Sequence, residues 1–151
     1  YKGIPLCLSS AIALTHLSKK DIGYFFDRKE KKAHGDQGLL VGKIPLETEV
    51  IALVDDVITD GQTKIEAIEK LKNWFGLRVS AVFVAFDRLE KNDEGIQASQ
   101  AFSEKTGIPV HAIITIYDVL SLLKEDSFKD TDQVPESSVE EIKSYLKIYS
   151  N

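Results

Sequence analysis

Apolar and polar positions follow one another along this chain in blocks that fit strands and helices in turn. Largely apolar runs lie at 50–54, 77–86 and 110–116, and such runs are typical of strands buried on both faces of a parallel sheet. Stretches with helical spacing of apolar residues separate them. This alternation predicts an α/β domain with a central, mostly parallel sheet flanked by helices.

Helical spacing is clearest after the first of these runs. Ile65, Ile68, Leu71 and Phe75 trace one stripe that ends at Gly76, and Trp74 and Phe75 are expected in the core. At the N-terminal end, a loop over 1–5 is expected to lead into a helix with an apolar face, Leu6, Leu8, Ile12, Ala13 and Leu17. The further expected elements are short strands at 24–26 and 39–41, helices at 96–106 and at 119–124 (capped by Asp118), a linker over 125–137 and a last amphipathic helix that carries Val139 to Tyr149.

The stretch 50–64, which reads VIALVDDVITDGQTK, carries the strongest chemical signal. Asp55 and Asp56 follow the apolar run at the carboxyl end of the expected strand, where open α/β sheets bind their ligands. Small polar residues and Gly61 then precede a helix, so backbone N–H groups are free to hold a phosphate. On these letters alone, solvated turn residues are an alternative of similar weight.

A cationic segment precedes this stretch. Residues 28–38 contain Arg28, Lys29, Lys31, Lys32 and His34 with two glycines and no apolar periodicity, which predicts a solvated loop. A charged surface turn is the plain interpretation. Its position upstream of a phosphate cradle favours another one, a lid of positive charge over an anionic group.

The composition of this chain of 151 residues excludes several kinds of function. A net charge of −5 implies no general affinity for nucleic acid or anionic membranes, and no apolar run reaches the length of a membrane span. The single Cys7 excludes an internal disulfide framework and fits a reducing compartment, so a cytoplasmic location is expected. The chain contains no methionine, and we expect the natural start to lie before Tyr1. No internal boundary appears, which predicts one domain over 1–151.

Four separated stretches resemble one family, the orotate phosphoribosyltransferases, a branch of the type I phosphoribosyltransferases. They are YKGIP at 1–5, FDRKEKKAHG at 26–35, VDDVITDGQT at 54–63 and FDR at 86–88. The third is shared by many phosphoribosyltransferases, whereas the second and fourth are more specific to this branch. The resemblance spans nearly the whole chain and implies the type I fold with a flexible catalytic loop.

The resemblance also implies an activity. These enzymes transfer ribose 5-phosphate from phosphoribosyl pyrophosphate to orotate, giving orotidine 5′-monophosphate and pyrophosphate in pyrimidine biosynthesis. Mg²⁺ is the implied cofactor, held mainly by pyrophosphate and water and not by protein ligands. A homodimer is implied as well, because the catalytic loop of one subunit closes over the site of its neighbour.

Site residues follow from the same resemblance. Lys32, Arg28, His34, Asp55 and Asp56 are implied to be catalytic, with Lys32 as the principal catalytic lysine of the loop. Thr59 and Arg88 are implied to contact orotate. The residues implied to bind phosphoribosyl pyrophosphate are Tyr1, Lys2, Lys29, Asp55, Asp56, Val57, Ile58, Asp60, Gly61, Gln62 and Thr63.

The chain departs from the family pattern in the cradle and at its beginning. Asp60 and Gln62 stand where small residues are commoner, and we expect the Asp60 carboxylate to turn to solvent because it would repel a phosphate. The family's N-terminal segment supplies a lysine and aromatic residues to the orotate pocket, and these cannot be assigned here.

Three other functions compete with this one. A regulatory relative without activity predicts loss of the lid cations, but Lys32 and His34 are present. A phospho-accepting receiver domain also opens with an apolar strand and two aspartates, but it leaves the lid unexplained, and Arg88 follows Asp87 where that family has a different turn. A transferase for another base shares the cradle, and Arg88 with the lid sequence favours orotate.

Overall fold

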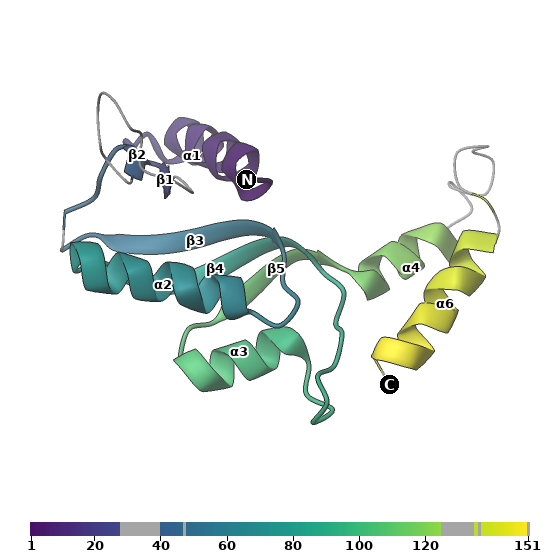
Figure 1. The fold of residues 1–151 in the computed structure, drawn as a ribbon. Helices are drawn as coiled ribbons and strands as arrows, with labels where there is room; N and C mark the ends of the chain where they lie inside the picture. Colours follow the sequence, from purple (N-terminus) through teal and green to yellow (C-terminus); the bar gives the residue numbers. More distant parts are fainter. Residues whose placement is uncertain (28–39, 47, 125–134, 136, 151) are drawn as a thin grey trace.

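The computed structural model describes residues 1–27, 40–46, 48–124, 135 and 137–150 (Figure 1). The elements in chain order are α1 (Gly3–Ser18), β1 (Phe25–Asp27), β2 (Leu40–Gly42), β3 (Val50–Val57), α2 (Gln62–Phe75), β4 (Arg78–Asp87), α3 (Ala98–Thr106), β5 (Val110–Thr115), α4 (Ile116–Lys124) and α6 (Ser137–Tyr149).

A parallel sheet with the strand order β3-β4-β5 lies at the centre of the described part of the chain. Helices α2 and α3 cover one side of it, and α1 lies beside β3 on the other side (Figure 1). Strands β1 and β2 form a separate antiparallel pair. The predicted α/β architecture with a mostly parallel sheet is confirmed.

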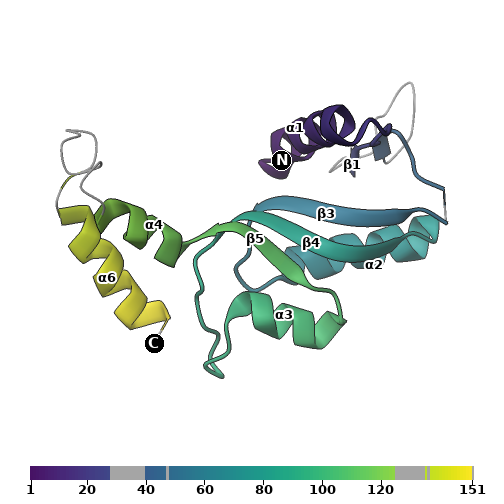
Figure 2. The same cartoon turned by 180° about the vertical axis from the view of Figure 1, so that it is seen from behind.

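The strands are in register at their carboxyl ends. Val57 of β3 pairs with Phe86 of β4, and Phe86 pairs with Ile114 of β5. The residues that follow all three strands therefore emerge at the same edge. Figure 2 shows α4 and α6 together beyond the carboxyl end of β5, where Leu146 and its apolar neighbours form a small core of their own.

The main core lies between the sheet and the α2–α3 layer. Val82 and Val84 of β4 are fully buried there against Ile58 and Phe102. Phe83, between the two valines, points to the opposite face, is 38% exposed and stacks on His111. The sheet face that α2 and α3 cover therefore contributes most of the apolar burial.

Three predicted helix starts differ from the structure: α3 begins two residues later, at Ala98, whereas α1 and α4 begin earlier. Helix α1 begins at Gly3, inside the expected loop; Pro5 is tolerated because the first N–H groups of a helix have no intrahelical acceptor in any case. Helix α4 begins at Ile116. Asp118 lies in its first turn and accepts hydrogen bonds from the N–H and hydroxyl of Thr115, an arrangement close to a capping box.

Two packing predictions also differ from the structure. Only Ala11 is buried on α1, whereas Ile12 and Leu17 of the expected apolar face are 62% and 77% exposed. Trp74 is expected in the core but is 56% exposed, whereas Phe75 beside it packs against the core residues Ile51, Leu77 and Val79. Gly76 ends α2 as predicted, with a φ of 67° that suits glycine.

The core predicts unequal costs for removing two phenylalanine rings. We expect Phe102→Ala to lower the free energy of unfolding by about 3–5 kcal/mol, because the ring is only 2% exposed and leaves a cavity between α3 and the sheet. Phe83→Ala removes a ring of the same size from the half-open face and is expected to cost clearly less. Urea denaturation of both variants measures the difference, and equal costs would place the main core elsewhere.

Candidate active site

The acidic pair and Asp87-Arg88 meet at one edge of the sheet. Asp55 and Asp56 lie within the last three residues of β3, and Asp87 ends β4, with Arg88 directly after it. Because Val57 pairs with Phe86, both groups emerge side by side at the carboxyl edge. Two polar clusters far apart in sequence are therefore close in space.

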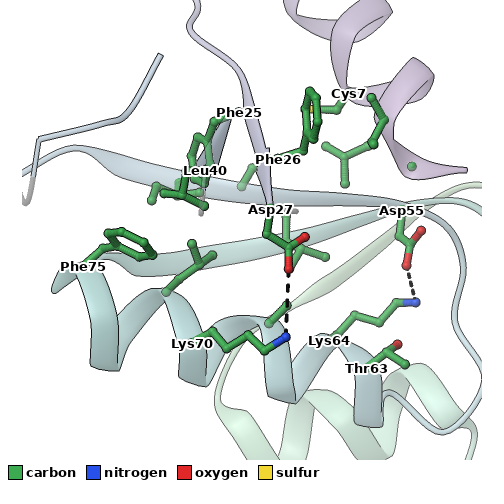
Figure 3. A pocket seen from close by; sticks show the side chains of 18 of the residues that line it. Cys7, Phe25, Phe26, Asp27, Leu40, Asp55, Thr63, Lys64, Lys70 and Phe75 are labelled. Atoms are coloured by element: carbon green, nitrogen blue, oxygen red, sulfur yellow. Dashed lines mark hydrogen bonds and ion pairs between the residues drawn. The ribbon is translucent and has the colours of Figure 1, made fainter. Parts of the chain in front are cut away.

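Asp55 and Asp56 contact different lysines on different sides of β3. Strand β3 continues to Val57, and neighbouring side chains in a strand point to opposite faces. The Asp55 carboxylate meets Lys64 of α2, with Nζ 2.5 Å from Oδ2 (Figure 3). Asp56 meets Lys2, which precedes α1, with Nζ 3.7 Å from Oδ2. Each carboxylate thus has its own counterion.

Asp55 is held in its ionised form. Burial is the largest influence on its pKa and by itself raises it, but the hydrogen bond from Lys64, the backbone N–H of Asp56 and the charge of Lys64 act in the other direction. The net result is a pKa below the ordinary value for aspartate. Hydrogen bonds to both oxygens fix the carboxylate, since Oδ1 accepts from the Asp56 N–H at 2.9 Å.

Gly3 allows the first turn of α1 to approach this carboxylate. A Cβ at this position would lie 2.8 Å from the Val54 carbonyl oxygen and 3.0 Å from Asp55 Oδ1. Any larger residue would therefore push the first turn of α1 away from β3. The glycine of the YKG motif is a packing requirement of the site.

The turn between β3 and α2 has the shape of an anion cradle. Gly61 precedes α2 with a φ of 74°, and a Cβ there would lie 2.7 Å from the Phe102 ring, so both conformation and space require glycine. The N–H groups of Lys64 and Ile65 donate to the Gly61 carbonyl. The described residues supply no acceptor for the N–H groups of Gly61 and Thr63, at the positive end of the α2 dipole.

Asp60 does not simply turn to solvent as expected. Its side chain is exposed, but Oδ1 accepts a hydrogen bond of 3.0 Å from the N–H of Gln62. A short side chain followed by a turn favours this local bond. The carboxylate therefore takes up one N–H donor of the cradle. The Gln62 side chain points along α2 and donates to Glu66.

The remaining predicted cradle residues differ in what they expose. The side chain of Ile58 is 1% exposed and belongs to the main core, so only its backbone is open to a ligand. Val57 is half-buried, whereas Thr59 and Thr63 are exposed. Tyr1 is 70% exposed at the start of the chain.

Arg88 belongs to a three-residue cluster that reaches the last helix. Its Nη2 lies 3.1 Å from Glu90 Oε2, and the Tyr145 hydroxyl of α6 donates to the other oxygen of Glu90. Burial and then this hydrogen bond raise the pKa of Tyr145 to about 12. The Leu89 N–H donates to Asp87, and Leu89 takes a φ of 55° that turns the chain sharply after β4. Helix α6 thereby orients Arg88.

A pocket of about 290 Å³ extends along β3 from this site. Apolar and aromatic side chains of α1, β1 and α2 form most of its wall, and Asp55, Thr63 and Lys64 lie at one end of it (Figure 3). Asp27 and Lys70 face each other across it, with Oδ2 and Nζ 4.0 Å apart.

Arg28, Lys29, Lys32 and His34 lie outside the described residues. Within the described ranges, no three His, Cys, Asp or Glu side chains gather in a way that could hold a metal ion. Over the same ranges, no helix has the length and apolar character needed to cross a membrane.

Sequence reasoning missed Lys64, Glu90 and Tyr145. A signal for Lys64 was present, because positions 64, 68, 71 and 75 share one helical face and the other three are apolar. A lysine on the buried face of a helix indicates a paired charge. Glu90 and Tyr145 are 55 positions apart, and no local pattern links them.

Known proteins resemble this chain in sequence, although no family model matches it. The orotate phosphoribosyltransferase of Methylococcus capsulatus is 44% identical over 124 residues, which are 82% of this chain and 57% of the relative. That of Bifidobacterium animalis is 42% identical over 123 residues, 80% of this chain and 53% of the relative. The chain thus spans little more than half the length of these curated relatives.

Solved structures agree with the sequence relatives. The crystal structure of orotate phosphoribosyltransferase from Francisella tularensis has a TM-score of 0.72 at 27% identity, over the whole of this chain and 67% of that one. A structure of Leishmania donovani UMP synthase has a TM-score of 0.63 at 25% identity, over 92% of this chain and 26% of that one. The predicted type I phosphoribosyltransferase fold is confirmed, and over most of its length the chain is similar to orotate phosphoribosyltransferases.

Proposed function

We propose that this chain carries the catalytic part of an orotate phosphoribosyltransferase, which transfers ribose 5-phosphate from phosphoribosyl pyrophosphate to orotate for UMP synthesis. One observation carries the proposal beyond the family likeness. The paired carboxylates and the α2 cradle lie at the end of β3, directly beside Arg88 at the end of β4. The residues proposed to bind phosphoribosyl pyrophosphate and the arginine proposed to bind orotate are thus adjacent at one edge of the sheet.

The donor side is built by β3 and the turn that follows it. The N–H groups of Gly61 and Thr63 and the α2 dipole suit the 5-phosphate. Asp55 and Asp56 suit the ribose hydroxyls, and their negative charge favours the cationic character that the sugar develops. Lys2, with its side chain 86% exposed, is free to follow the pyrophosphate.

The reaction exchanges one bond at the ribose C1. The bond from C1 to the pyrophosphate oxygen breaks, and its electron pair leaves with pyrophosphate. A bond from C1 to N1 of orotate forms, and the N1 proton is lost. The lid residues Arg28, Lys29, Lys32 and His34 are proposed to stabilise the departing charge, and a closed lid keeps water from the donor.

Mg²⁺ is proposed to enter with the donor. The Asp55 and Asp56 carboxylates are each paired with a lysine, which suits an ion held mainly by pyrophosphate and water and not by protein ligands. The bound ion would neutralise phosphate charge. We also propose a cytoplasmic location, because the single Cys7 fits a reducing compartment.

Arg88 is proposed to read the orotate carboxylate. A guanidinium offers two parallel hydrogen bonds to a carboxylate, which a lysine does not. Glu90 occupies Nη2 on one edge and so limits the orientation of the fork. Thr59, exposed at the end of β3, is proposed to contact the same substrate.

The proposed activity is tested with the purified protein, Mg²⁺ and phosphoribosyl pyrophosphate. Orotate absorbance is expected to fall, and hypoxanthine, adenine and uracil are expected not to react, because they lack the carboxylate for Arg88. An Arg88→Lys variant keeps the positive charge but lacks the two parallel hydrogen bonds of the guanidinium, and it should turn over orotate more slowly than the native protein. Turnover of uracil with none of orotate would contradict the proposal.

Asp60 is predicted to weaken donor binding. Asp60→Asn keeps an oxygen for the Gln62 N–H but removes the charge, and about 1 kcal/mol for one charge pair in water corresponds to roughly fivefold tighter binding of phosphoribosyl pyrophosphate. Calorimetry at low salt measures this change. Glu69→Gln is the control, because it removes the charge of an exposed residue two turns along α2, and it should leave the affinity for phosphoribosyl pyrophosphate unchanged. Equal gains in affinity for both variants would show that only the net charge of the protein matters.

A shared site in a homodimer predicts complementation. Lys32→Ala is expected to lower kcat by roughly 10²-fold or more, as when one charge-stabilising donor is lost. A second protein with Asp55→Asn and Asp56→Asn should also be nearly inactive. Mixing the two and allowing subunits to exchange should restore part of the activity, because some mixed sites combine an intact lid with an intact acidic pair. No recovery would count against a lid shared between subunits.

A further inference from the structure

We propose that Lys64 is a positioning residue, whose buried ammonium holds Asp55 ionised and oriented toward the ribose of the donor. The inference rests on the proposed function and assigns a role to a residue outside the family motif residues named above. Its side chain is 7% exposed, which makes Lys64 one of the few buried charged groups among the described residues.

Burial makes the pair a permanent one. A lysine is almost never fully buried unless it is paired, because the ammonium loses its water shell. Lys64 regains this loss through Asp55 Oδ2 at 2.5 Å. Removing either partner would leave the other charge in a half-buried site without compensation. The pair is therefore expected to persist whether or not a donor is bound.

The two lysines of the acidic pair differ in the way this role requires. The Lys2 side chain is 86% exposed and lies 3.7 Å from Asp56, so water or a phosphate can replace that contact at little cost. Lys64 has no such freedom, because it extends from the first turn of α2 into the protein. Asp56 thus has an exchangeable counterion and Asp55 a fixed one.

Contacts from three directions determine the Asp55 geometry. Lys64 binds Oδ2 from α2, and the Asp56 N–H binds Oδ1 from β3. From the third side, α1 approaches so closely at Gly3 that a Cβ there would lie 3.0 Å from Oδ1. A side chain held in this way needs little reorganisation when a hydroxyl arrives. Remaining lone pairs of the carboxylate stay available to donors such as sugar hydroxyls.

Other ionisable groups nearby do not replace Lys64. Asp56 adds negative charge from the same strand, and Lys2 contacts Asp56 on the α1 side. Asp27 and Lys70 in the adjoining pocket face one another at 4.0 Å. Tyr1 and Cys7 also line the pocket, and burial raises the pKa of the Cys7 thiol. Lys64 donates directly to the Asp55 carboxylate.

The sign of the pH effect follows from the fixed pair. Because the pKa of Asp55 is lowered in the folded protein, its contribution to stability is present above the ordinary aspartate pKa and lost as the pH falls through the folded-state pKa. In Lys64→Met the burial remains and the counterion is gone. The pKa of Asp55 should then rise, and the variant should lose stability as the pH rises through it.

The experiment compares native protein with Lys64→Met, Lys64→Arg and the control Lys72→Met, an exposed lysine on the same helix. Carbon-13 NMR of the aspartate carboxyls follows the titration of Asp55, and kcat and KM for phosphoribosyl pyrophosphate are measured across pH. In Lys64→Met we expect a raised Asp55 pKa and an acid limb displaced to higher pH. We also expect kcat/KM to be lower by on the order of 10- to 100-fold, as when a group is misplaced in a site. Lys64→Arg should largely restore the native pH profile, and Lys72→Met should match native protein.

Each outcome separates the role of Lys64 from the proposed function. An unchanged Asp55 pKa in Lys64→Met, or lower activity with an unchanged pH profile, overturns the inference and leaves a structural ion pair. If native protein shows no transfer to orotate, the proposed function fails by itself. Calorimetric binding of phosphoribosyl pyrophosphate then decides the inference: weaker binding by Lys64→Met than by Lys72→Met supports it, and equal binding overturns it.

Discussion

The compensation of negative charge at the end of β3 is the constraint on which the candidate site depends. Two adjacent carboxylates lie beside a turn proposed to hold a phosphate, and uncompensated they would repel the donor. Alternation along β3 sends them to opposite sides, where Lys64 of α2 and Lys2 before α1 each take one. Both helices must therefore approach β3 closely, and at Gly3 the approach of α1 leaves no room for a Cβ.

The two halves of the proposed site are built by different parts of the chain. Lys64 of α2 and Lys2 before α1 are the counterions of the acidic pair, whereas Arg88 is oriented by Glu90 and through it by Tyr145 of α6. The two halves meet where β3 and β4 lie side by side with their carboxyl ends in register. Changes in α6 are thus expected to reach the acceptor side without altering the charge balance around Asp55.

Local patterns predicted the elements well, and the parallel pairing of β3 with β4 brings Asp55, Asp56 and Arg88 to one edge of the sheet. Apolar runs identified β3, β4 and β5, and Gly76 identified the end of α2, because each of these signals lies in consecutive residues. Contacts between distant residues were not predictable in this way. The Glu90–Tyr145 hydrogen bond has no local signature, and the α1 face mispredicted as buried requires knowledge of what packs on it. Lys64 is an intermediate case: its helical spacing indicates a buried lysine but does not identify Asp55 as its partner.

Asp60 shows that charge repulsion alone does not predict where a carboxylate side chain lies. Repulsion from a phosphate suggested that its carboxylate would face away from the cradle, yet the nearest uncompensated donor was the Gln62 N–H, two residues along the chain. In the absence of a ligand, the same N–H that would attract a phosphate attracts this carboxylate. Phosphate binding by the cradle and the competing contact of Asp60 both result from one feature, the N–H groups at the start of α2 that have no intrahelical acceptor. Phosphoribosyl pyrophosphate must displace the hydrogen bond between the Gln62 N–H and Asp60 to use all of these N–H groups. Asp60 is therefore expected to weaken binding of the phosphate without preventing it.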